Sequence, residues 1–539
     1  MSVSENTVVD VFNQAVKEYR THRAFTCLGK SLTFEDIDIL SAKFASYLQK
    51  NTKLVPGDRI AIQLPNVLQY PVALFGSIRA GLVVVNTNPL YTPREIKHQL
   101  SDSGAKALVV FANVAASAAE VIKDTNVENV VITEIGDLHS PFKRLLLNTV
   151  VKHIRKGVPD FVFPSKCKQH SFHQVISSSE PNYKTVVRSP SDVCVLQYTG
   201  GTTGVAKGAM LTNANLVANK DQVVDHLSGL IRHNEDTYVA PLPLYHIYAF
   251  TLHCMALLSS GNHSLLIPNP RDLKAFVNAM KKETIYGFAG LNTLFNALCQ
   301  NEEFKKLDFS HMESTSSGGM ALTSDTSKLW QEITGVTPNE GYGLTETSPV
   351  VSSSRQGEIQ SGTVGTPVKG TELKVVNDNG ETLEAGEVGE LWVRGPQVMK
   401  GYWLRPEETA KVLDSDGWFK TGDMAIIQKD GYLKIVDRKK DMILVSGFNV
   451  YPNEIEDILS EYEGIMEAGV IGIPDEHSGE VVKAFIVPKN ENVTKDDVLT
   501  FCKKNMAGYK VPKSIEFVSD LPKSAVGKIL RKDLKKLDL

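Results

Sequence analysis

A run of glycine, threonine and lysine at residues 198–209 is the stretch best suited to chemistry. It reads Tyr-Thr-Gly-Gly-Thr-Thr-Gly-Val-Ala-Lys-Gly-Ala and follows a short apolar segment, 193–197, that reads as a buried strand. Glycine lets a backbone approach a ligand closely, and successive N–H groups in such a loop form a nest for anions, to which threonine hydroxyls add donors. Lys207 supplies a mobile positive charge. These features predict a loop that holds a polyphosphate.

This loop differs from the Walker A phosphate loop. That motif needs glycine, lysine and serine or threonine in immediate succession. Here two residues separate Gly204 from Lys207, and another glycine follows the lysine. The alternative is a flexible turn without a ligand, and the motifs downstream decide against it.

Two further glycine-rich turns carry groups that a nucleotide could use. Residues 317–320 read Ser-Gly-Gly-Met, and residues 340–346 read Glu-Gly-Tyr-Gly-Leu-Thr-Glu. In the second turn the glycines free the backbone around Tyr342, while Thr345 and Glu346 offer a hydroxyl and a carboxylate. An aromatic face, a hydroxyl and an acid suit a base, a phosphate and Mg²⁺. A Gly-Tyr-Gly turn is common, so this pattern is weak when taken alone.

Charged residues gather toward the C-terminal part of the chain. Residues 417–423 end in Asp423, which we expect to be exposed on a turn. Residues 436–441 pack five charges between a sheet-rich segment and a new strand–helix series, so we expect a domain boundary there; the alternative is a solvated loop. Lys528 follows a glycine, and we expect it on a turn that reaches outward.

The elements that position these residues alternate between helices and strands. Helical spacing of apolar residues and short apolar runs predict helices at 6–20 and 67–80 and strands at 59–64, 82–85, 106–111 and 129–133. Capping boxes open two more helices, at Thr33 with Asp36 and at Thr92 with Glu95. Such alternation implies a largely parallel sheet covered on both faces. Residues 442–539 read as a separate small α+β unit that ends in a basic tail.

Residues 142–156 stand apart from this pattern. As a helix they place Phe142, Leu146, Leu147, Val150, Val151 and Ile154 on one face and Arg144, Lys152, Arg155 and Lys156 on the other. This is typical of an amphipathic helix that lies in a membrane interface. The alternative, which the sequence favours slightly, is a surface helix docked on its own core.

Composition and charge limit the class of protein. The 539 residues predict roughly three or four domain-sized units of ordinary globular composition, 42% hydrophobic and 22% charged. A net charge of −4 gives no reason to expect a nucleic-acid partner. The six cysteines are widely spaced, and the first residues lack the basic and apolar regions of a signal peptide. No apolar run is long enough to span a membrane, so we expect a cytoplasmic location.

These motifs resemble those of the adenylate-forming enzymes, the superfamily of acyl-CoA synthetases, luciferases and peptide-synthetase adenylation domains. Within it, the chain is most similar to bacterial long-chain fatty acid–CoA ligases. The resemblance covers essentially the whole chain, and five motifs follow in the family's order. It implies an α/β fold in which residues 1–436 form a large domain of mixed, largely parallel sheets covered by helices. A hinge at 437–441 would then lead to a small mobile α+β domain at 442–539.

The resemblance assigns nucleotide roles to the glycine-rich turns. It implies that residues 199–207 hold the β- and γ-phosphates, that 318–320 line the adenine pocket, and that Tyr342 stacks on adenine. Asp423 is expected to accept both ribose hydroxyls. The residues implied to bind ATP or CoA are Tyr198, Thr199, Gly200, Gly201, Thr202, Thr203, Gly204, Lys207, Gly318, Gly319, Met320, Gly341, Tyr342, Gly343, Asp423, Arg438 and Gly447, the last beside the pantetheine tunnel, with Glu346 and Thr202 at Mg²⁺.

The resemblance also assigns the catalytic groups. It implies that Lys528 is the lysine of the adenylation step, that Thr345 contacts the α-phosphate, and that His246 lies near the acyl carboxylate; the implied catalytic residues are Lys528, Thr345, Glu346 and His246. Lys440 matches the hinge position. Residues 242–258 are rich in Tyr, Phe and Leu, which favours a long apolar acyl tunnel with Tyr245 and Phe250 on its wall.

One departure from the family lies in the phosphate loop. The family usually has Ser-Gly at the start of the loop and proline before the lysine, where this chain has Gly200-Gly201 and Ala206. Glycine keeps the turn but removes a hydroxyl, so we expect phosphate binding to rest more on backbone amides.

The implied activity is a two-step ligation with ATP, Mg²⁺ and CoA. A fatty acid would attack the α-phosphorus of ATP, pyrophosphate would leave, and the CoA thiol would then displace AMP, which is the first step of fatty acid degradation and lipid use. A ligase for a shorter or aromatic acid, or a luciferase-like oxygenase, stays open at this stage. So do peripheral association with the inner face of the cytoplasmic membrane and a homodimer.

Overall fold

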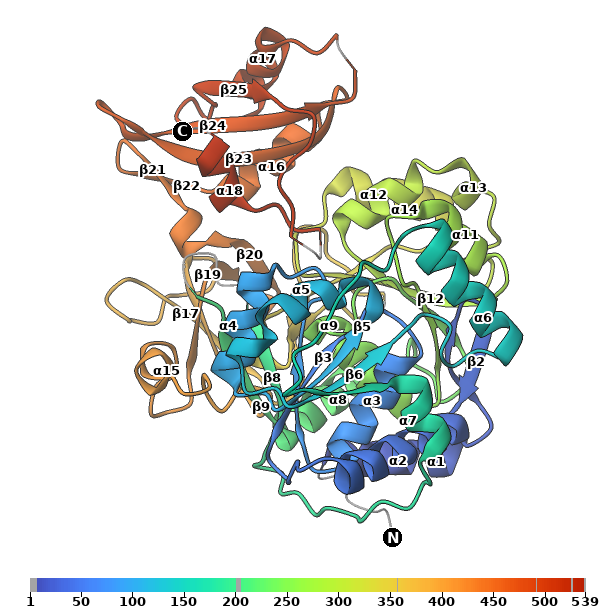
Figure 1. Cartoon of the computed structure of the whole chain (residues 1–539). Helices are drawn as coiled ribbons and strands as arrows, with labels where there is room; N and C mark the ends of the chain where they lie inside the picture. Colours follow the sequence, from blue (N-terminus) through green and yellow to red (C-terminus); the bar gives the residue numbers. More distant parts are fainter. Residues whose placement is uncertain (1–6, 200–204, 356, 491, 525–526, 538–539) are drawn as a thin grey trace.

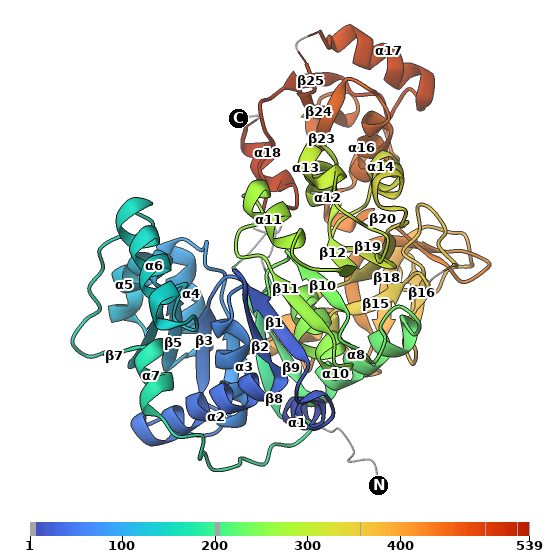
Figure 2. The same ribbon diagram turned by 90° about the vertical axis from the view of Figure 1, so that its right-hand side faces the viewer.

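The computed structural model describes residues 7–199, 205–355, 357–490, 492–524 and 527–537. Four sheets organise them: two large ones, a small antiparallel one, and one in the C-terminal part of the chain. Figure 1 shows the C-terminal part, in red, set apart at one end of the molecule above the two large sheets. In Figure 2, turned by 90°, the two large sheets lie side by side, and each contains strands drawn in blue and strands drawn in green.

The seven-stranded sheet has the order β7-β6-β5-β3-β4-β8-β9. Its strands run parallel except for β9, which pairs antiparallel with β8. The central strands are buried along their length and read as continuous apolar runs, as expected of a parallel sheet covered on both faces. The strands are β3 Arg59–Gln63, β4 Val83–Asn86, β5 Ala107–Phe111, β6 Asn129–Thr133, β7 Lys168–Ser171, β8 Val193–Thr199 and β9 Lys207–Thr212.

The nine-stranded sheet has the order β16-β15-β14-β13-β12-β10-β11-β1-β2. It is parallel from β14 to β1 and antiparallel at both ends. The strands are β1 Arg23–Cys27, β2 Lys30–Thr33, β10 Thr237–Ala240, β11 His263–Leu266, β12 Ile285–Gly290, β13 Ser314–Gly318, β14 Asn339–Gly343, β15 Val350–Ser353 and β16 Thr366–Pro367.

Two smaller sheets complete the fold. One is an antiparallel meander of β17 Glu372–Val376, β18 Gly389–Arg394, β19 Phe419–Ile427 and β20 Leu433–Arg438. The other joins β21 Ile443–Val445, β22 Phe448–Val450, β23 Ile465–Asp475, β24 Gly479–Pro488 and β25 Ser514–Phe517. The second sheet packs a core of its own with the helices of the C-terminal part; these are α16 Pro452–Ser460, α17 Lys495–Asn505 and α18 Arg531–Leu537.

Helices cover the two large sheets and share their main core. Helices α1, α2 and α3 pack with the helical segment 247–259, and the rings of Phe12 and Phe75 stack 4.3 Å apart. Residues 247–259 run through α9, a π-helical stretch and α10, and π-helical turns are frequent at functional sites. The helices before the C-terminal part are α1 Val8–Tyr19, α2 Phe34–Asn51, α3 Gln69–Arg79, α4 Pro93–Ser103, α5 Ala115–Val121, α6 Pro141–Thr149, α7 Phe172–Ser178, α8 Asn213–His226, α9 Ile247–Ala249, α10 Leu257–Ser259, α11 Leu273–Met280, α12 Asn292–Cys299, α13 Glu302–Lys305, α14 Ser324–Thr334 and α15 Pro406–Val412, with π-helical η3 Val150–Ile154 and η4 Phe250–Ala256 and 3₁₀ turns η1 Ala112–Val114, η2 Ile122–Asp124, η5 Thr345–Thr347 and η6 Lys439–Asp441.

The mixed α/β fold with a smaller C-terminal part confirms the predicted fold class. Both predicted capping boxes form. The Thr33 hydroxyl accepts from the Asp36 N–H at 3.1 Å while the Asp36 carboxylate accepts from the Thr33 N–H at 2.9 Å, and Thr92 and Glu95 make the same exchange. These boxes were predictable because they depend on residues three apart.

The prediction that Asp423 is exposed on a turn is wrong. Asp423 lies inside strand β19 and is only 4% exposed, with Arg438 opposite it on β20. Gly417 and Gly422, which precede Asp423, favour a turn locally, but pairing of β19 with β18 and β20 extends the segment into a nine-residue strand.

The helix at 141–154 does not bury a single continuous apolar face. Every residue of α6 and η3 is exposed or half-buried. Leu147, Val150 and Val151 are half-buried, whereas the exposed members are Phe142, Leu145, Leu146 and Ile154, at 80%, 68%, 52% and 73%. The helix lies at the periphery in both views (Figures 1 and 2). Within the described part of the chain, no helix is long and apolar enough to cross a membrane.

Candidate active site

A cavity of about 1910 Å³ lies where all four sheets contribute residues. Tyr198 and Lys207 come from the seven-stranded sheet, and Tyr342 from the nine-stranded sheet. Asp423 comes from the antiparallel meander, and Lys528 comes from the C-terminal part. The carboxyl ends of β8, β13 and β14 open into this cavity, which is where ligands bind in open α/β sheets.

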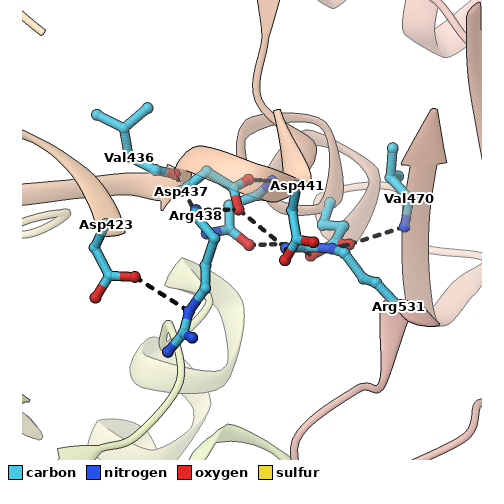
Figure 3. A network of polar contacts seen from close by, with 9 residues as sticks. Asp423, Val436, Asp437, Arg438, Asp441, Val470 and Arg531 are labelled. Atoms are coloured by element: carbon cyan, nitrogen blue, oxygen red, sulfur yellow. Dashed lines mark hydrogen bonds and ion pairs between the residues drawn. The ribbon is translucent and has the colours of Figure 1, made fainter. Parts of the chain in front are cut away.

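The buried carboxylate of Asp423 is the centre of a cluster of polar side chains in the cavity wall. The Tyr342 hydroxyl donates to one carboxylate oxygen of Asp423 at 2.6 Å, and Arg438 Nε lies 3.1 Å from the other (Figure 3). Burial, together with the neighbouring carboxylate, raises the pKa of Tyr342, so its hydroxyl stays protonated. A carboxylate has about four acceptor positions. Asp423 therefore keeps acceptor capacity for hydroxyls of a ligand.

The turn after β13 forms another part of the wall. A Cβ on Gly318 would lie 3.3 Å from the Tyr248 ring, and Gly319 has a φ of +86°, which disfavours any other residue. The Tyr248 hydroxyl is 2.9 Å from Ser316 Oγ on the same strand. Met320 follows on the cavity wall. This turn and the Tyr248 ring make a flat, narrow surface suited to a planar base.

Glu346 follows the glycine-rich segment 341–343 and offers a carboxylate to the same cavity. It lies in η5 and accepts a hydrogen bond from the Tyr402 hydroxyl at 2.8 Å. Burial raises the pKa of Glu346, while the Tyr402 hydrogen bond acts in the other direction. Among the described residues, no group of three His, Cys, Asp or Glu side chains could hold a metal ion by itself.

Lys207 is engaged by residues that sequence reasoning did not single out. Its ammonium pairs with Glu408 in α15 and lies 5.1 Å from the centroid of the Tyr402 ring. Glu408 also pairs with Lys411, and the Lys207 and Lys411 ammonium groups lower the pKa of Glu408 to about 2. Tyr402 thus contacts both Lys207 and Glu346. The predicted loop residues Gly200, Gly201, Thr202, Thr203 and Gly204 lie outside the described residues.

Lys528 enters the cavity from the C-terminal part. The Ser524 N–H donates to the Lys528 carbonyl at 2.7 Å, which holds the backbone at Lys528. Burial, followed by the positive charge of Arg438, lowers the pKa of Lys528 to about 8. Gly527, the residue before Lys528, lies close to the large part of the chain, because a Cβ on Gly527 would lie 2.7 Å from Thr293 Oγ1. Lys528 therefore points into the cavity rather than outward.

His246 is a half-buried neighbour of Lys528. Burial and the Lys528 charge lower the pKa of His246 to about 4, so its ring is neutral near pH 7. His246 caps α9, and its Nδ1 accepts from the Tyr248 N–H at 3.4 Å. A neutral His246 ring therefore adds no positive charge beside Lys528.

The remaining predicted residues divide into two sets. Most line the cavity, namely Tyr198, Thr199, Gly341, Gly343, Thr345, Tyr245 and Lys440. Phe250 does not: it is fully buried in the main core, and Tyr248, Thr251 and Leu252 occupy the nearby wall. Gly447 lies on the exposed turn between β21 and β22, away from the cavity lining.

Sequence reasoning missed Tyr402, Glu408 and Arg531. Tyr402 and Glu408 follow a glycine-rich segment without any distinctive motif, and Arg531 appears only as part of a basic tail. Their partners lie 56, 201 and 94 residues away in sequence, at Glu346, Lys207 and Asp437. No local pattern signals contacts over such separations.

Comparison with known proteins agrees with this architecture. A family model described as AMP-binding enzyme matches residues 12–403, and one described as AMP-binding enzyme C-terminal domain matches residues 454–528. The chain belongs to the AMP-binding enzyme family, which confirms the superfamily resemblance.

Relatives and solved structures align over nearly the whole chain. The long-chain-fatty-acid–CoA ligase of Escherichia coli O157:H7 is 47% identical, covering 98% of this chain and 94% of the relative. The long-chain-fatty-acid–CoA ligase of Bacillus subtilis (strain 168) is 34% identical, covering 99% and 95%. ATP-bound MatB from Rhodopseudomonas palustris has a TM-score of 0.84 at 27% identity, covering 98% of each chain. The anthranilate CoA ligase AuaEII in complex with anthranoyl-AMP has a TM-score of 0.87 at 25% identity, covering 98% and 97%.

Proposed function

We propose that this chain is an AMP-forming long-chain fatty acid–CoA ligase. It joins a fatty acid to ATP, giving an acyl-adenylate and pyrophosphate, and then transfers the acyl group to CoA with release of AMP. The observation that carries the proposal is that Lys528 and Asp423 line one cavity together with Glu346. Asp423 precedes the hinge segment in the sequence and Lys528 follows it. The names of the relatives that align over nearly the whole chain support the same reaction.

The nucleotide occupies the wall built by β13, β14 and β19. Tyr342 and the turn at 318–320 hold the adenine, and Asp423 accepts the ribose hydroxyls with the capacity that Tyr342 and Arg438 leave free. Thr345 reaches the α-phosphate. Lys207 reaches the β- and γ-phosphates, together with the loop at 199–204.

The donor set suits Mg²⁺ carried by the nucleotide. Mg²⁺ is usually bound by one or two carboxylates plus substrate phosphates rather than by an all-protein cage. Glu346, a cavity-lining carboxylate oriented by Tyr402, fits that pattern. Glu346, with Thr202, would hold the ion, which when bound neutralises charge on the phosphates.

Adenylation depends on positioning and on charge. The acyl carboxylate attacks the α-phosphorus, and the Lys528 ammonium stabilises the negative charge that develops there. His246 is neutral and lies beside Lys528, so it can orient the carboxylate without adding charge. Burial of this region keeps water away from the acyl-adenylate.

Thioester formation requires Lys528 to leave. Lys528 lines the cavity near Asp423 and Arg438, and in the proposed mechanism its side chain occupies space that the CoA thiol needs. The C-terminal part, residues 442–539, turns about the hinge at 437–441, with Lys440 as the pivot. The exposed turn at Gly447 then approaches the pantetheine arm, so that one chain builds two sites in succession.

The acyl chain packs against apolar residues of the cavity wall. Val223 and Leu227 from the region of α8, and Leu252 from η4, lie on its wall with Leu242 and Ile247. Each methylene that becomes buried contributes about 0.8 kcal/mol. Such a wall favours long chains.

The test is a comparison of acids from two to eighteen carbons, with benzoate and ferulate included. Pyrophosphate release and CoA-thioester formation are both measured. We expect both signals to rise with chain length and to be greatest for long-chain acids. A maximum at short or aromatic acids would reject the long-chain assignment, and light emission without a thioester would indicate an oxygenase.

We further propose that the enzyme attaches reversibly to the cytoplasmic face of the membrane through residues 141–156. Four large apolar side chains of this helix are more than half exposed, at Phe142, Leu145, Leu146 and Ile154. Lys152, Arg155 and Lys156 are exposed beside them and suit anionic headgroups. The homodimer stays a prediction.

A further inference from the structure

A buried network of charges joins the two sides of the hinge segment. At its centre, Arg531 begins helix α18 in the C-terminal part, three residues after Lys528. Figure 3 shows its guanidinium beside the carboxylates of Asp437 and Asp441. The Arg531 side chain is 14% exposed and that of Asp437 is 1% exposed.

Some contacts of this network join residues before the pivot Lys440 to residues after it. Arg531 Nη1 lies 3.0 Å from Asp437 Oδ1, and Asp437 belongs to β20, before Lys440. The other carboxylate oxygen of Asp437 accepts from the backbone N–H of Asn453 at 2.7 Å. The side-chain amide of Asn453 donates to the Val436 carbonyl at 3.2 Å. Any rotation of the backbone at Lys440 separates these groups.

The other contacts lie within the C-terminal part. Arg531 Nη2 lies 2.8 Å from Glu456 Oε2, and Arg531 Nε donates to Glu456 Oε1 at 3.2 Å. This bidentate ion pair is kept when the C-terminal part rotates, because α16 and α18 belong to the same unit. Arg531 therefore never becomes an unpaired buried charge, which would cost several kcal/mol. Asp437 is the partner that the rotation leaves behind.

We propose that Arg531 is a positioning residue that fastens the C-terminal part to Asp437 and thereby holds Lys528 in the adenylation site. The inference rests on the proposed function, since it assigns the contact to the first of its two half-reactions. The arginine fork suits this role, because it can hold Glu456 and Asp437 at once. Release of Asp437 alone frees the unit for the second half-reaction.

The decisive variant is Asp437→Asn, which keeps the acceptor for the Asn453 N–H and leaves Arg531 paired with Glu456. We expect acyl-adenylate formation to slow by roughly tenfold to a hundredfold, the range for loss of one coupled contact of about 1–3 kcal/mol. Thioester formation from premade acyl-adenylate should be unchanged or faster. The rate of acyl-adenylate formation in Arg531→Lys should fall between the rates of the wild type and of Arg531→Gln. The matched control is Lys510→Gln, which removes an ion pair with Glu454 inside the C-terminal part.

Distance measurements separate the fastening contact from the reaction. All six native cysteines are buried, so Glu302→Cys and Lys503→Cys place one exposed label on each side of the hinge. Energy transfer between the labels should report one narrow distance in the parent protein and a broader distribution with Asp437→Asn. An unchanged distribution, or an equal loss in both half-reactions with a lowered melting temperature, overturns the proposal. If the parent protein performs neither half-reaction, the proposed function fails, and the label distances still test the contact.

Discussion

At the scale of single residues, Lys528 separates the two half-reactions most cleanly. Its ammonium lies in the cavity, but the residue belongs to the part of the chain that moves in the proposed mechanism. Lys528→Ala should slow acyl-adenylate formation by roughly 10²- to 10³-fold, as for loss of one preorganised donor. Thioester formation from premade acyl-adenylate should be nearly intact. Lys536→Ala, at an exposed lysine of the following helix α18, serves as the control, and equal losses in both half-reactions would refute the assignment.

The pH dependence of adenylation follows from the same residue. Burial lowers the pKa of Lys528 to about 8, so the ammonium form predominates below pH 8 and is lost as the pH rises through that value. Because kcat/KM reports groups of the free enzyme, kcat/KM for ATP in pyrophosphate exchange should fall above about pH 8. In Lys528→Arg the guanidinium stays charged, so any residual activity should lack this fall. A profile that is the same in both proteins would assign the pKa to another group.

Tyr402 shows how one side chain can align two binding groups. Its hydroxyl bonds Glu346 and its ring lies against the Lys207 ammonium. Tyr402→Phe removes only the hydroxyl, and loss of such an outer contact weakens metal binding by roughly 10- to 100-fold. Calorimetry can measure the Mg²⁺ concentration that a non-hydrolysable ATP analogue needs in order to bind. In Tyr402→Phe this concentration should rise by the same factor. Tyr432→Phe, which loses a bond to the Glu358 carbonyl instead, should leave that concentration unchanged.

At the scale of elements, the helical segment 247–259 distinguishes a wall residue from a core residue. Leu252 lines the cavity, so Leu252→Trp should shift the chain-length profile toward shorter acids without changing the KM for ATP. Phe250 is fully buried in the core. Phe250→Ala should instead lower the free energy of unfolding by about 3–5 kcal/mol, through lost burial and a cavity. If Phe250→Ala changes the profile and Leu252→Trp does not, the acyl chain follows another path.

Sequence alone predicted the elements whose causes are local. The capping boxes at Thr33 and Thr92 and the apolar strands β3 to β6 depend on neighbouring residues, and they formed as expected. Asp423 was misjudged because pairing with β18 and β20 decides its exposure. Its ion pair with Arg438 and the contact of Arg531 with Asp437 depend on how distant segments meet. No short pattern in a single sequence predicts contacts between segments that lie so far apart along the chain.

At the scale of the whole molecule, the placement of charge matters more than its sum. The net charge of −4 does not exclude an anionic partner, because surface charges act mainly within a Debye length of about 10 Å at 0.1 M salt. The helix at 141–154 combines exposed apolar and basic side chains at one edge of the large domain (Figure 2). Not all of its basic residues are free to face a membrane. Lys143 bonds the Leu28 carbonyl, and Arg144 contacts His173.

The membrane prediction therefore concerns Lys152, Arg155 and Lys156. Basic residues near an anionic leaflet contribute roughly 1 kcal/mol each and lose that contribution in high salt. Replacing the three by Gln should abolish co-sedimentation with anionic liposomes at low salt. Melting temperature and activity on detergent-dispersed substrate should stay unchanged, because the three side chains are exposed.

Two controls separate surface attachment from non-specific attraction. Replacing Lys306, Lys369 and Lys536 by Gln makes the same change in net charge at exposed sites elsewhere, and sedimentation should persist. Phe142→Ser with Leu145→Ser keeps every charge but removes exposed apolar surface, so it should weaken sedimentation even at low salt. If both triple variants lose binding equally, the attraction is general rather than local to this helix. If the unaltered protein does not sediment with anionic liposomes, the helix has no membrane role, and its exposed apolar side chains need another partner.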